Sequence, residues 1–251
     1  MMLCPIAPAC AVDIGARGLV FHLGFFRGLA SGLVSGLVSG LVWAMLCTVL
    51  VPSASAAEPR NPLRIIAFGD SLVAGYQLAL TDAFPAQLER ALKAAGHDVE
   101  IANAGVSGDT TAAALARLDW AIPDGTDAVI LELGANDMLR GLDTAAARRN
   151  LEAMITRIKA KGATILLAGM RSVDNWGADY AQRFDAIFPE LARQHGVALY
   201  PFFMDGVIGR PALSLADGLH PNPRGVGQIV AGIQPAVAQM ITRIKAGQPA
   251  P

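Results

Sequence analysis

The chain has 251 residues, and its 20 lysines and arginines against 21 aspartates and glutamates give a formal net charge of -1 at pH 7. This length allows one domain or at most two. A surface that follows nucleic-acid phosphates needs an excess or a stripe of basic residues, and because no segment supplies one, the composition argues against a nucleic-acid-binding protein.

The N-terminal segment, residues 1–57, differs in composition from the rest of the chain. The whole chain is 53% apolar and only 16% charged, and the segment 18–51 accounts for this bias because Arg27 is its one lysine, arginine or acidic residue. Small residues at Ser55 and Ala57 then match the cleavage site of a secretory signal peptide. We therefore predict that residues 1–57 form a leader, either a cleaved signal peptide or an uncleaved membrane anchor, and that the protein is exported to the periplasm or secreted.

Residues 58–251 are expected to form a single domain without disulfides or thiolate metal sites, because Cys4, Cys10 and Cys47 all lie in the leader. The macromolecular contacts that the sequence predicts are transient binding to the export machinery and, for an uncleaved leader, attachment to a membrane through the leader alone.

The domain alternates short apolar runs with helical patterns. Runs typical of buried strands cover residues 64–68, 99–103, 128–133, 164–168 and 197–200. Helical patterns cover residues 83–95, 111–121, 143–161, 179–195 and 223–244. Gly96, Gly162 and Gly196 each follow a helical pattern, where glycine is the usual end signal. This alternation predicts an α/β fold with a doubly wound, five-stranded parallel sheet.

In such sheets, reactive groups gather in the loops that follow the carboxyl ends of the strands. The polar segments expected there are Gly69-Asp70-Ser71, Asn103-Ala104-Gly105-Val106-Ser107-Gly108-Asp109-Thr110, Gly134-Ala135-Asn136-Asp137 and, near the C-terminus, Asp217-Gly218-Leu219-His220.

These loops contain every part that ester hydrolysis by a serine requires. Ser71 follows a tight turn and can be the nucleophile, while His220 can accept its proton. Asp217 precedes His220 by three residues, and on a helical turn this spacing brings a carboxylate beside the imidazole. The Ser71 N–H, the Gly105 N–H and the Asn136 side-chain amide are the expected oxyanion donors. Glycine suits that position because the absence of a side chain lets its N–H approach a ligand.

The four segments resemble blocks I, II, III and V of the SGNH (GDSL) hydrolase family, and the resemblance runs from about residue 63 to 244. Gly69-Asp70-Ser71-Leu72 with Gly75-Tyr76, Ser107-Gly108-Asp109-Thr110 and Phe202-Phe203-Met204 are most similar to its bacterial arylesterase, thioesterase and lysophospholipase branch. The resemblance implies a three-layer, flavodoxin-like sandwich, no cofactor and no metal, and hydrolysis of acyl esters and thioesters through an acyl-enzyme.

The segment 170–177 departs from that branch, because it lacks a proline-containing stretch before Asn175-Trp176-Gly177. In relatives this loop flanks the acyl pocket, so the preferred acyl-chain length does not follow from the resemblance. Tyr76, Trp176 and Phe202 are our candidates for the pocket lining.

Other readings of the same residues remain. Asp137 is expected to cap the short helical turn after its own strand, and His97 and His195 are expected to be structural because each lies beside a helix-ending glycine. A carbohydrate O-deacetylase with the same catalytic residues, and a non-catalytic binding module anchored by its leader, are the alternative functions.

Overall fold

The computed structural model of the protein describes residues 61–248. The expected leader, residues 1–57, lies outside the described residues. In residues 61–248, no helix combines the length and the hydrophobicity that a membrane crossing requires.

The described chain alternates five strands with helices, as the sequence pattern predicted. The strands are β1 (Leu63–Gly69), β2 (Val99–Gly105), β3 (Ala128–Glu132), β4 (Thr164–Ala168) and β5 (Ala198–Tyr200). The α-helices are α1 (Ser71–Ala74), α2 (Phe84–Ala94), α3 (Thr111–Ala121), α4 (Ala135–Leu139), α5 (Thr144–Ala160), α6 (Ala178–His195) and α7 (Pro223–Lys245). Short 3-10 turns occur at Leu80–Asp82, Asp174–Trp176 and Pro211–Leu213.

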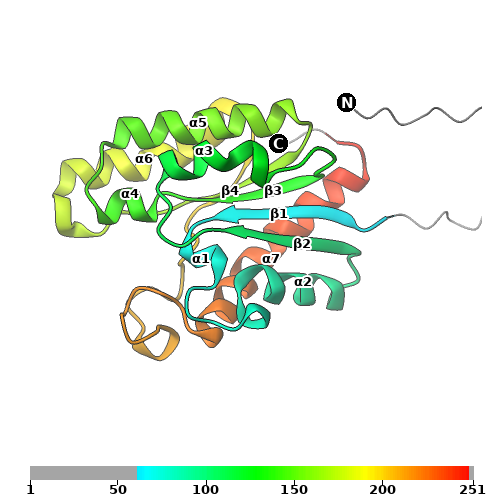
Figure 1. Ribbon diagram of the computed structural model, residues 1–251, viewed down its shortest axis with the longest axis horizontal. Helices are drawn as coiled ribbons and strands as arrows, with labels where there is room; N and C mark the ends of the chain where they lie inside the picture. The colour runs from blue at the N-terminus through cyan, green and yellow to red at the C-terminus, as the bar shows by residue number, and fades with distance from the viewer. Residues whose placement is uncertain (1–60, 249–251) are drawn as a thin grey trace, which may run out of the picture. The chain divides into compact units, whose positions relative to one another are not determined.

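The five strands form one sheet in the order β2-β1-β3-β4-β5, and every neighbouring pair is parallel. This is the flavodoxin-like order, in which the direction of winding reverses between β1 and β3. Figure 1 shows the sheet between two helical layers, with α3, α5 and α6 over one face and α2 and α7 over the other. The predicted three-layer α/β class is therefore confirmed.

Burial explains which strand takes which place. Every residue of β3 is buried, as expected of a central strand covered on both faces, whereas β2 at the edge alternates buried and exposed positions in its first half. The parallel pairing brings the carboxyl ends of β1, β2 and β3 to the same end of the sheet. The loops after these strands are consequently neighbours in space.

Glycines end the longer helices where the sequence predicted helix ends. Gly96, Gly162 and Gly196 have φ angles of 84°, 80° and 57°, the left-handed conformation that stops a helix without steric cost in glycine. At the other end of α5, the Asp143 side chain accepts hydrogen bonds from the backbone N–H groups of Ala145 and Ala146, which fixes the start of that helix.

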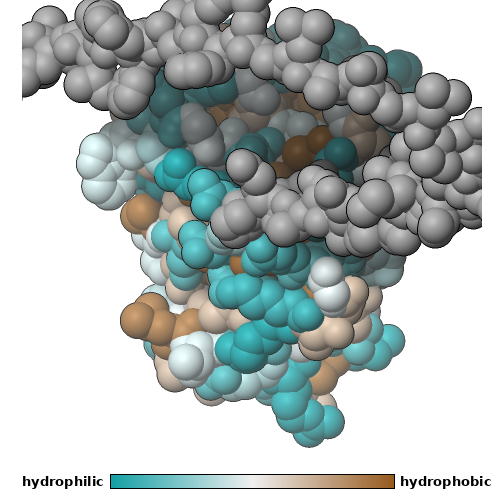
Figure 2. All heavy atoms as spheres, turned by 90° about the vertical axis from the view of Figure 1, so that its right-hand side faces the viewer, coloured by the Kyte–Doolittle hydropathy of each residue, from teal (hydrophilic) through white to brown (hydrophobic). Residues whose placement is uncertain are grey.

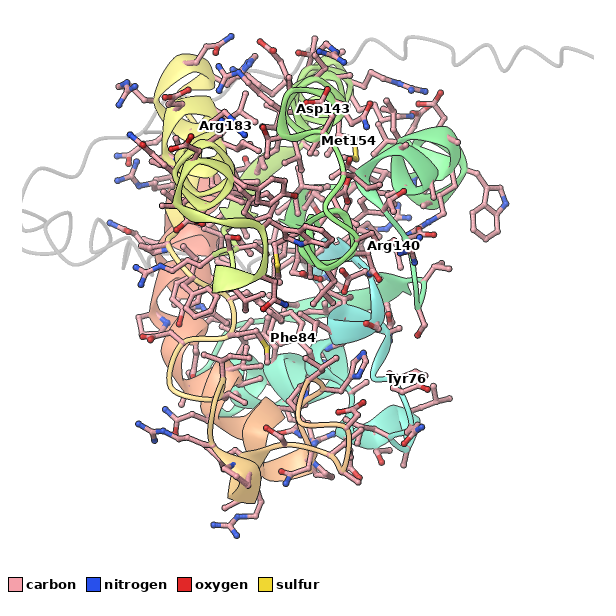
Figure 3. All side chains as sticks on the ribbon, turned by 90° about the vertical axis from the view of Figure 1, so that its left-hand side faces the viewer. Tyr76, Phe84, Arg140, Asp143, Met154 and Arg183 are labelled. Carbon is pink, nitrogen blue, oxygen red and sulfur yellow. The ribbon has the colours of Figure 1, made fainter. Side chains whose placement is uncertain are left out.

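The two ends of the sheet differ in what they present. Figure 2 views the end at which the strands begin, and hydrophilic residues cover much of the part of that face that is not grey. Figure 3 views the opposite end, where the strands finish, with Tyr76 toward the α2 and α7 layer and Arg140 toward α3. The candidate site lies at this second end.

Candidate active site

Ser71 is the first residue of α1, directly after the turn that ends β1. Asp70 precedes this helix as its N-cap, and its carboxylate Oδ1 accepts a hydrogen bond of 3.0 Å from the Leu72 N–H. The cap holds the start of α1 in place against the sheet. Ser71 is largely buried, yet its hydroxyl reaches the cleft described below.

His220 contacts the Ser71 hydroxyl although the two residues are 149 positions apart. The distance from His220 Nε2 to Ser71 Oγ is 2.9 Å, and His220 Nδ1 lies 2.7 Å from Asp217 Oδ2. The carboxylate thus orients the ring so that Nε2 can accept the serine proton. The structure brings together the three residues that the sequence singled out for nucleophilic catalysis.

A tight turn, and not the helical turn that we expected, brings the Asp217 carboxylate beside the His220 ring. Asp217 Oδ1 accepts hydrogen bonds from the backbone N–H groups of Leu219, at 2.9 Å, and His220, at 3.0 Å. A backbone hydrogen bond of 2.7 Å from Leu215 N–H to the His220 carbonyl closes this segment. The hydrogen bond from the His220 backbone N–H, followed by that from its ring, lowers the pKa of Asp217 to about 2, so its side chain is an anion at neutral pH.

Asn136 approaches the same point from α4, after β3. Its Nδ2 donates a hydrogen bond of 3.1 Å to Asp70 Oδ2. Because Nδ2 carries two hydrogens, one remains for a ligand. The side chain lines the cleft together with Ser71 and His220.

Gly105 does not fit the role that the sequence suggested. Its N–H already donates a hydrogen bond of 3.0 Å to Asn103 Oδ1. A Cβ at Gly105 would lie 2.2 Å from the backbone nitrogen of Ala74, so this residue must be glycine because β2 packs directly against α1. The requirement for glycine is steric, and the amide is occupied.

Gly108, in the same loop, is a better candidate that sequence reasoning missed. Within residues 61–248, neither its N–H nor that of Ser71 donates a hydrogen bond to another part of the chain. The Gly108 carbonyl accepts a hydrogen bond of 2.9 Å from Arg140 Nη2, which restrains the peptide. The signal for Gly108 was the Ser107-Gly108-Asp109-Thr110 segment, which follows Gly105, the first glycine of the same loop.

A cleft of about 290 Å³ opens beside Ser71 and His220. Its wall is mainly apolar, and the residues that build it include Met138, Leu139, Met170, Phe202, Met204 and Ile208. Such a lining suits the hydrocarbon part of a ligand.

Of the three predicted pocket residues, only Phe202 lines this cleft. The Tyr76 ring instead packs on the His220 imidazole, with 4.5 Å between ring centres. Trp176 is half-exposed, donates a hydrogen bond of 2.8 Å from Nε1 to the Met138 carbonyl, and covers Gly141. It therefore braces the segment that contains Met138 and Leu139 from outside.

We expected Asp137 to cap its own helical turn, but in the structure it does not. Its Oδ2 accepts a hydrogen bond of 2.8 Å from the Thr111 N–H, and its Oδ1 accepts one of 2.6 Å from Thr111 Oγ1. The side chain thus ties α4, which bears Asn136, to the start of α3. His195 Nε2 lies 3.3 Å from Glu152 Oε1 on the neighbouring helix, away from the cleft.

No metal cluster forms in the described part of the chain, where no three His, Cys, Asp or Glu side chains come together as ligands. That the reaction uses no metal or cofactor stays a prediction.

The resemblance drawn from the four loops is confirmed by relatives. A sequence model of the GDSL-like Lipase/Acylhydrolase family matches residues 67–227. The arylesterase of Vibrio mimicus is 38% identical over 200 residues, which cover 79% of this chain and 96% of that protein. Thioesterase 1/protease 1/lysophospholipase L1 of Escherichia coli K12 is 37% identical over 181 residues, which cover 72% of this chain and 85% of that protein.

Among solved structures, AlinE4, an SGNH-hydrolase family esterase, matches with a TM-score of 0.61 and 45% identity over 72% of this chain and 97% of that chain. The contact between Ser71 Oγ and His220 Nε2 agrees with these similarities. The chain belongs to the GDSL-like lipase/acylhydrolase family and is a hydrolase that acts on esters.

Proposed function

We propose that the protein is a serine esterase that hydrolyses acyl esters and acyl thioesters through an acyl-enzyme on Ser71. The observation that carries the proposal is the continuous contact from Ser71 Oγ to His220 Nε2, at 2.9 Å, and from His220 Nδ1 to Asp217 Oδ2, at 2.7 Å. In this arrangement an alcohol, a base and an orienting anion stand in the order that nucleophilic catalysis requires.

The first half of the reaction forms the acyl-enzyme. Ser71 Oγ attacks the substrate carbonyl carbon while His220 Nε2 takes the serine proton. The carbonyl oxygen becomes an oxyanion, which we assign to the N–H groups of Ser71 and Gly108 and to the free N–H of Asn136 Nδ2. The imidazolium then gives its proton to the departing alcohol or thiol, and the carbon–oxygen or carbon–sulfur bond breaks.

The second half releases the acid. Water, deprotonated by His220, attacks the acyl carbon, and Ser71 recovers its proton from His220 as the acyl–oxygen bond breaks. Asp217 stays ionised throughout and stabilises the imidazolium in both halves. This division of roles needs no group beyond the side chains and amides already described.

The substrate class follows from the cleft. Its apolar wall receives the acyl chain, and the arylesterase and thioesterase/lysophospholipase names of the relatives support esters and thioesters as substrates. A sugar would need many hydrogen-bonding partners along the wall, so the mainly apolar lining favours an acyl ester over a carbohydrate O-acetyl group.

We further propose that residues 1–57 export the protein to the periplasm or the medium, on the strength of the apolar segment 18–51 and the small residues at Ser55 and Ala57. N-terminal sequencing of secreted material checks this. A mature chain that begins near residue 58 supports cleavage, while material that keeps the leader supports an anchor.

The catalytic assignment is tested with Ser71→Ala, and Ser214→Ala is its matched control. The Ser214 hydroxyl donates to the Arg210 carbonyl and lies outside the cleft. Ser71→Ala should lower kcat for p-nitrophenyl butyrate by about 10⁴-fold or more and abolish labelling by a fluorophosphonate, whereas Ser214→Ala should keep both. Parental activity in Ser71→Ala would contradict the assignment.

A further inference from the structure

Two carboxyl groups that the proposed reaction does not use lie buried behind Ser71. Glu132, the last residue of β3, and Asp70, the cap of α1, both have no solvent-exposed surface. Glu132 Oε2 accepts a hydrogen bond of 3.3 Å from the Asp70 N–H, and Glu132 Oε1 has no hydrogen-bond partner. An unpartnered buried oxygen is costly, so this pair calls for an explanation.

The backbone is shaped to admit the Glu132 carboxyl. A Cβ at Gly69 would lie 2.5 Å from Glu132 Oε2, so only glycine leaves room for the acid against the turn that precedes Ser71. The Glu132 carboxyl thus lies directly against the backbone of Asp70, whose own charge is near enough to raise the pKa of Glu132.

Asp70 connects this pair to the site. Its Oδ1 accepts from the Leu72 N–H at 3.0 Å and its Oδ2 accepts from Asn136 Nδ2 at 3.1 Å. The same carboxylate therefore holds the helix that bears Ser71 and the amide that we assign to the oxyanion. Whatever fixes Asp70 fixes two parts of the site.

The electrostatics show that the pair cannot be fully ionised at low cost. Burial, and then the Asp70 charge, raise the pKa of Glu132 well above its usual value. Burial raises the pKa of Asp70 to about 6, against the lowering effect of the Leu72 and Asn136 hydrogen bonds and of His220, while Asp109 adds to the rise. In residues 61–248, no lysine or arginine forms an ion pair with either group. Two adjacent buried carboxyls without a cation favour a single shared charge.

We propose that Glu132 is a positioning residue that stays protonated and donates its proton to the Asp70 carboxylate, which then holds the Asn136 amide and the start of α1 in register with the oxyanion. The inference rests on the proposed function. The shared proton fixes Asp70 by a hydrogen bond and keeps a second negative charge away from the place where the oxyanion forms.

The kinetic test compares Glu132→Leu with Glu132→Gln. Leucine removes the donor at similar size and should lower kcat for p-nitrophenyl butyrate by about 10- to 100-fold, the range known for outer hydrogen-bond partners of metal ligands, with KM little changed. Glutamine supplies an N–H donor in place of the carboxylic acid, so kcat should stay within about threefold of the parent. A glutamine variant as poor as the leucine variant would overturn the proposal.

The route through Asn136 is tested by a double-mutant cycle. If Glu132 acts through Asp70 on the Asn136 amide, Glu132→Leu should lower kcat little further in an Asn136→Ala background. An equal loss in both backgrounds would show that Glu132 does not act through the Asn136 amide and would contradict the inference. Should Asn136→Ala alone leave kcat unchanged, the oxyanion assignment in the proposed function fails instead.

The proton on the Glu132 carboxyl can be detected by a measurement that does not depend on enzyme activity. Infrared spectra of the full chain at pH 8 should show a protonated-carboxyl C=O stretch that disappears in Glu132→Gln. Asp137→Asn is the matched control, because Asp137 is also buried but both its oxygens accept hydrogen bonds from Thr111, and the band should survive there. A spectrum without the band, or a band that survives Glu132→Gln, would overturn the inference whatever the kinetics of Ser71 variants.

Discussion

At the scale of single residues, the site depends on two ionisable groups with separate tasks. The low pKa of Asp217, about 2, keeps it anionic at every pH well above that value. The imidazole of His220, in contrast, must be neutral to accept the Ser71 proton. On the acid side the reaction therefore depends on a neutral His220 and also on Asp70, whose pKa burial raises to about 6.

We accordingly expect kcat/KM for p-nitrophenyl butyrate to fall as the pH is lowered from 8 to 4. Asp217→Asn should lower kcat by about 10⁴-fold, because the amide favours the wrong imidazole tautomer. Initial rates over this range for the parent and the variant test both statements. An activity that is flat from pH 4 to 8 would argue against His220 as the base.

The Asn136 amide is expected to act on the transition state alone. Removing it as Asn136→Ala should lower kcat by about 10²–10³-fold. KM for the same ester should change little, since the ground-state carbonyl needs this donor less than the oxyanion does. A loss confined to KM would instead place Asn136 in substrate binding.

The catalytic side chains could be predicted from the sequence, whereas the backbone donors of the oxyanion site could not. Ser71, Asp217 and His220 carry chemistry that few other side chains supply, so their roles could be read from the sequence. Every residue except proline has a backbone N–H, so residue type does not reveal an oxyanion donor. Gly105 and Gly108 are both glycines in the same loop, and the sequence does not tell them apart. The hydrogen bond from Gly105 to Asn103 and the close packing of Gly105 against Ala74 distinguish the two in the structure.

At the scale of elements, one side chain joins the loops after β1 and β2. Arg117 on α3 donates from Nε to Asp109 Oδ2 at 2.6 Å, from Nη1 to the Ala104 carbonyl at 2.9 Å and from Nη2 to the Gly69 carbonyl at 2.9 Å. Its guanidinium also lies 4.3 Å from the centre of the Phe68 ring. The turn before Ser71 and the loop containing Gly108 are therefore aligned by a single planar group.

Arg117→Lys should lower both stability and kcat, because an ammonium cannot make three divergent hydrogen bonds in one plane. We expect a loss of about 1.5–3 kcal/mol in the free energy of unfolding, the range for hydrogen bonds to charged groups. Urea titration measures it, and Arg157→Lys is the matched control. Arg157 pairs with Asp119 at the surface, where such pairs contribute at most about 1 kcal/mol. Equal effects of the two changes would contradict the special position of Arg117.

The long elements could be predicted from sequence because periodicity and end signals agree there. The expected helix 111–121 coincides with α3, and the expected helix 143–161 differs from α5 only by its caps. The helices α1 and α4 are too short for periodicity to show, with 4 and 5 residues. Tertiary contacts place them, and both carry residues of the site.

At the scale of the whole molecule, the buried carboxyl pair links the site to stability. A carboxyl whose pKa is raised on folding binds its proton more tightly in the folded state. Between the ordinary value of 3.8 and about 6 for Asp70, folding takes up protons, so the free energy of unfolding falls as the pH rises. The pKa of Asp217 is lowered on folding, so its effect on stability has the opposite pH dependence. That effect falls between pH 3.8 and about 2, below the range in which Asp70 acts.

The parent protein should therefore lose more stability between pH 4.5 and pH 7.5 than Glu132→Gln does. The difference should be several kcal/mol, because Glu132 keeps its proton throughout this range when folded and loses it when unfolded. One proton taken up on folding changes the free energy of unfolding by about 1.4 kcal/mol for each pH unit. Urea unfolding of both proteins at the two pH values measures it. Parallel pH dependences would show that the pair does not change its protonation on folding.

The distance along the chain between nucleophile and base has a consequence for synthesis. A ribosome makes Ser71 and all five strands of the sheet before it makes His220 and α7. The last helix follows His220 directly and packs on α2, where Gln87 Nε2 donates to the Pro223 carbonyl at 3.0 Å. A chain cut short before His220 therefore lacks the base that Ser71 requires, and should not hydrolyse esters.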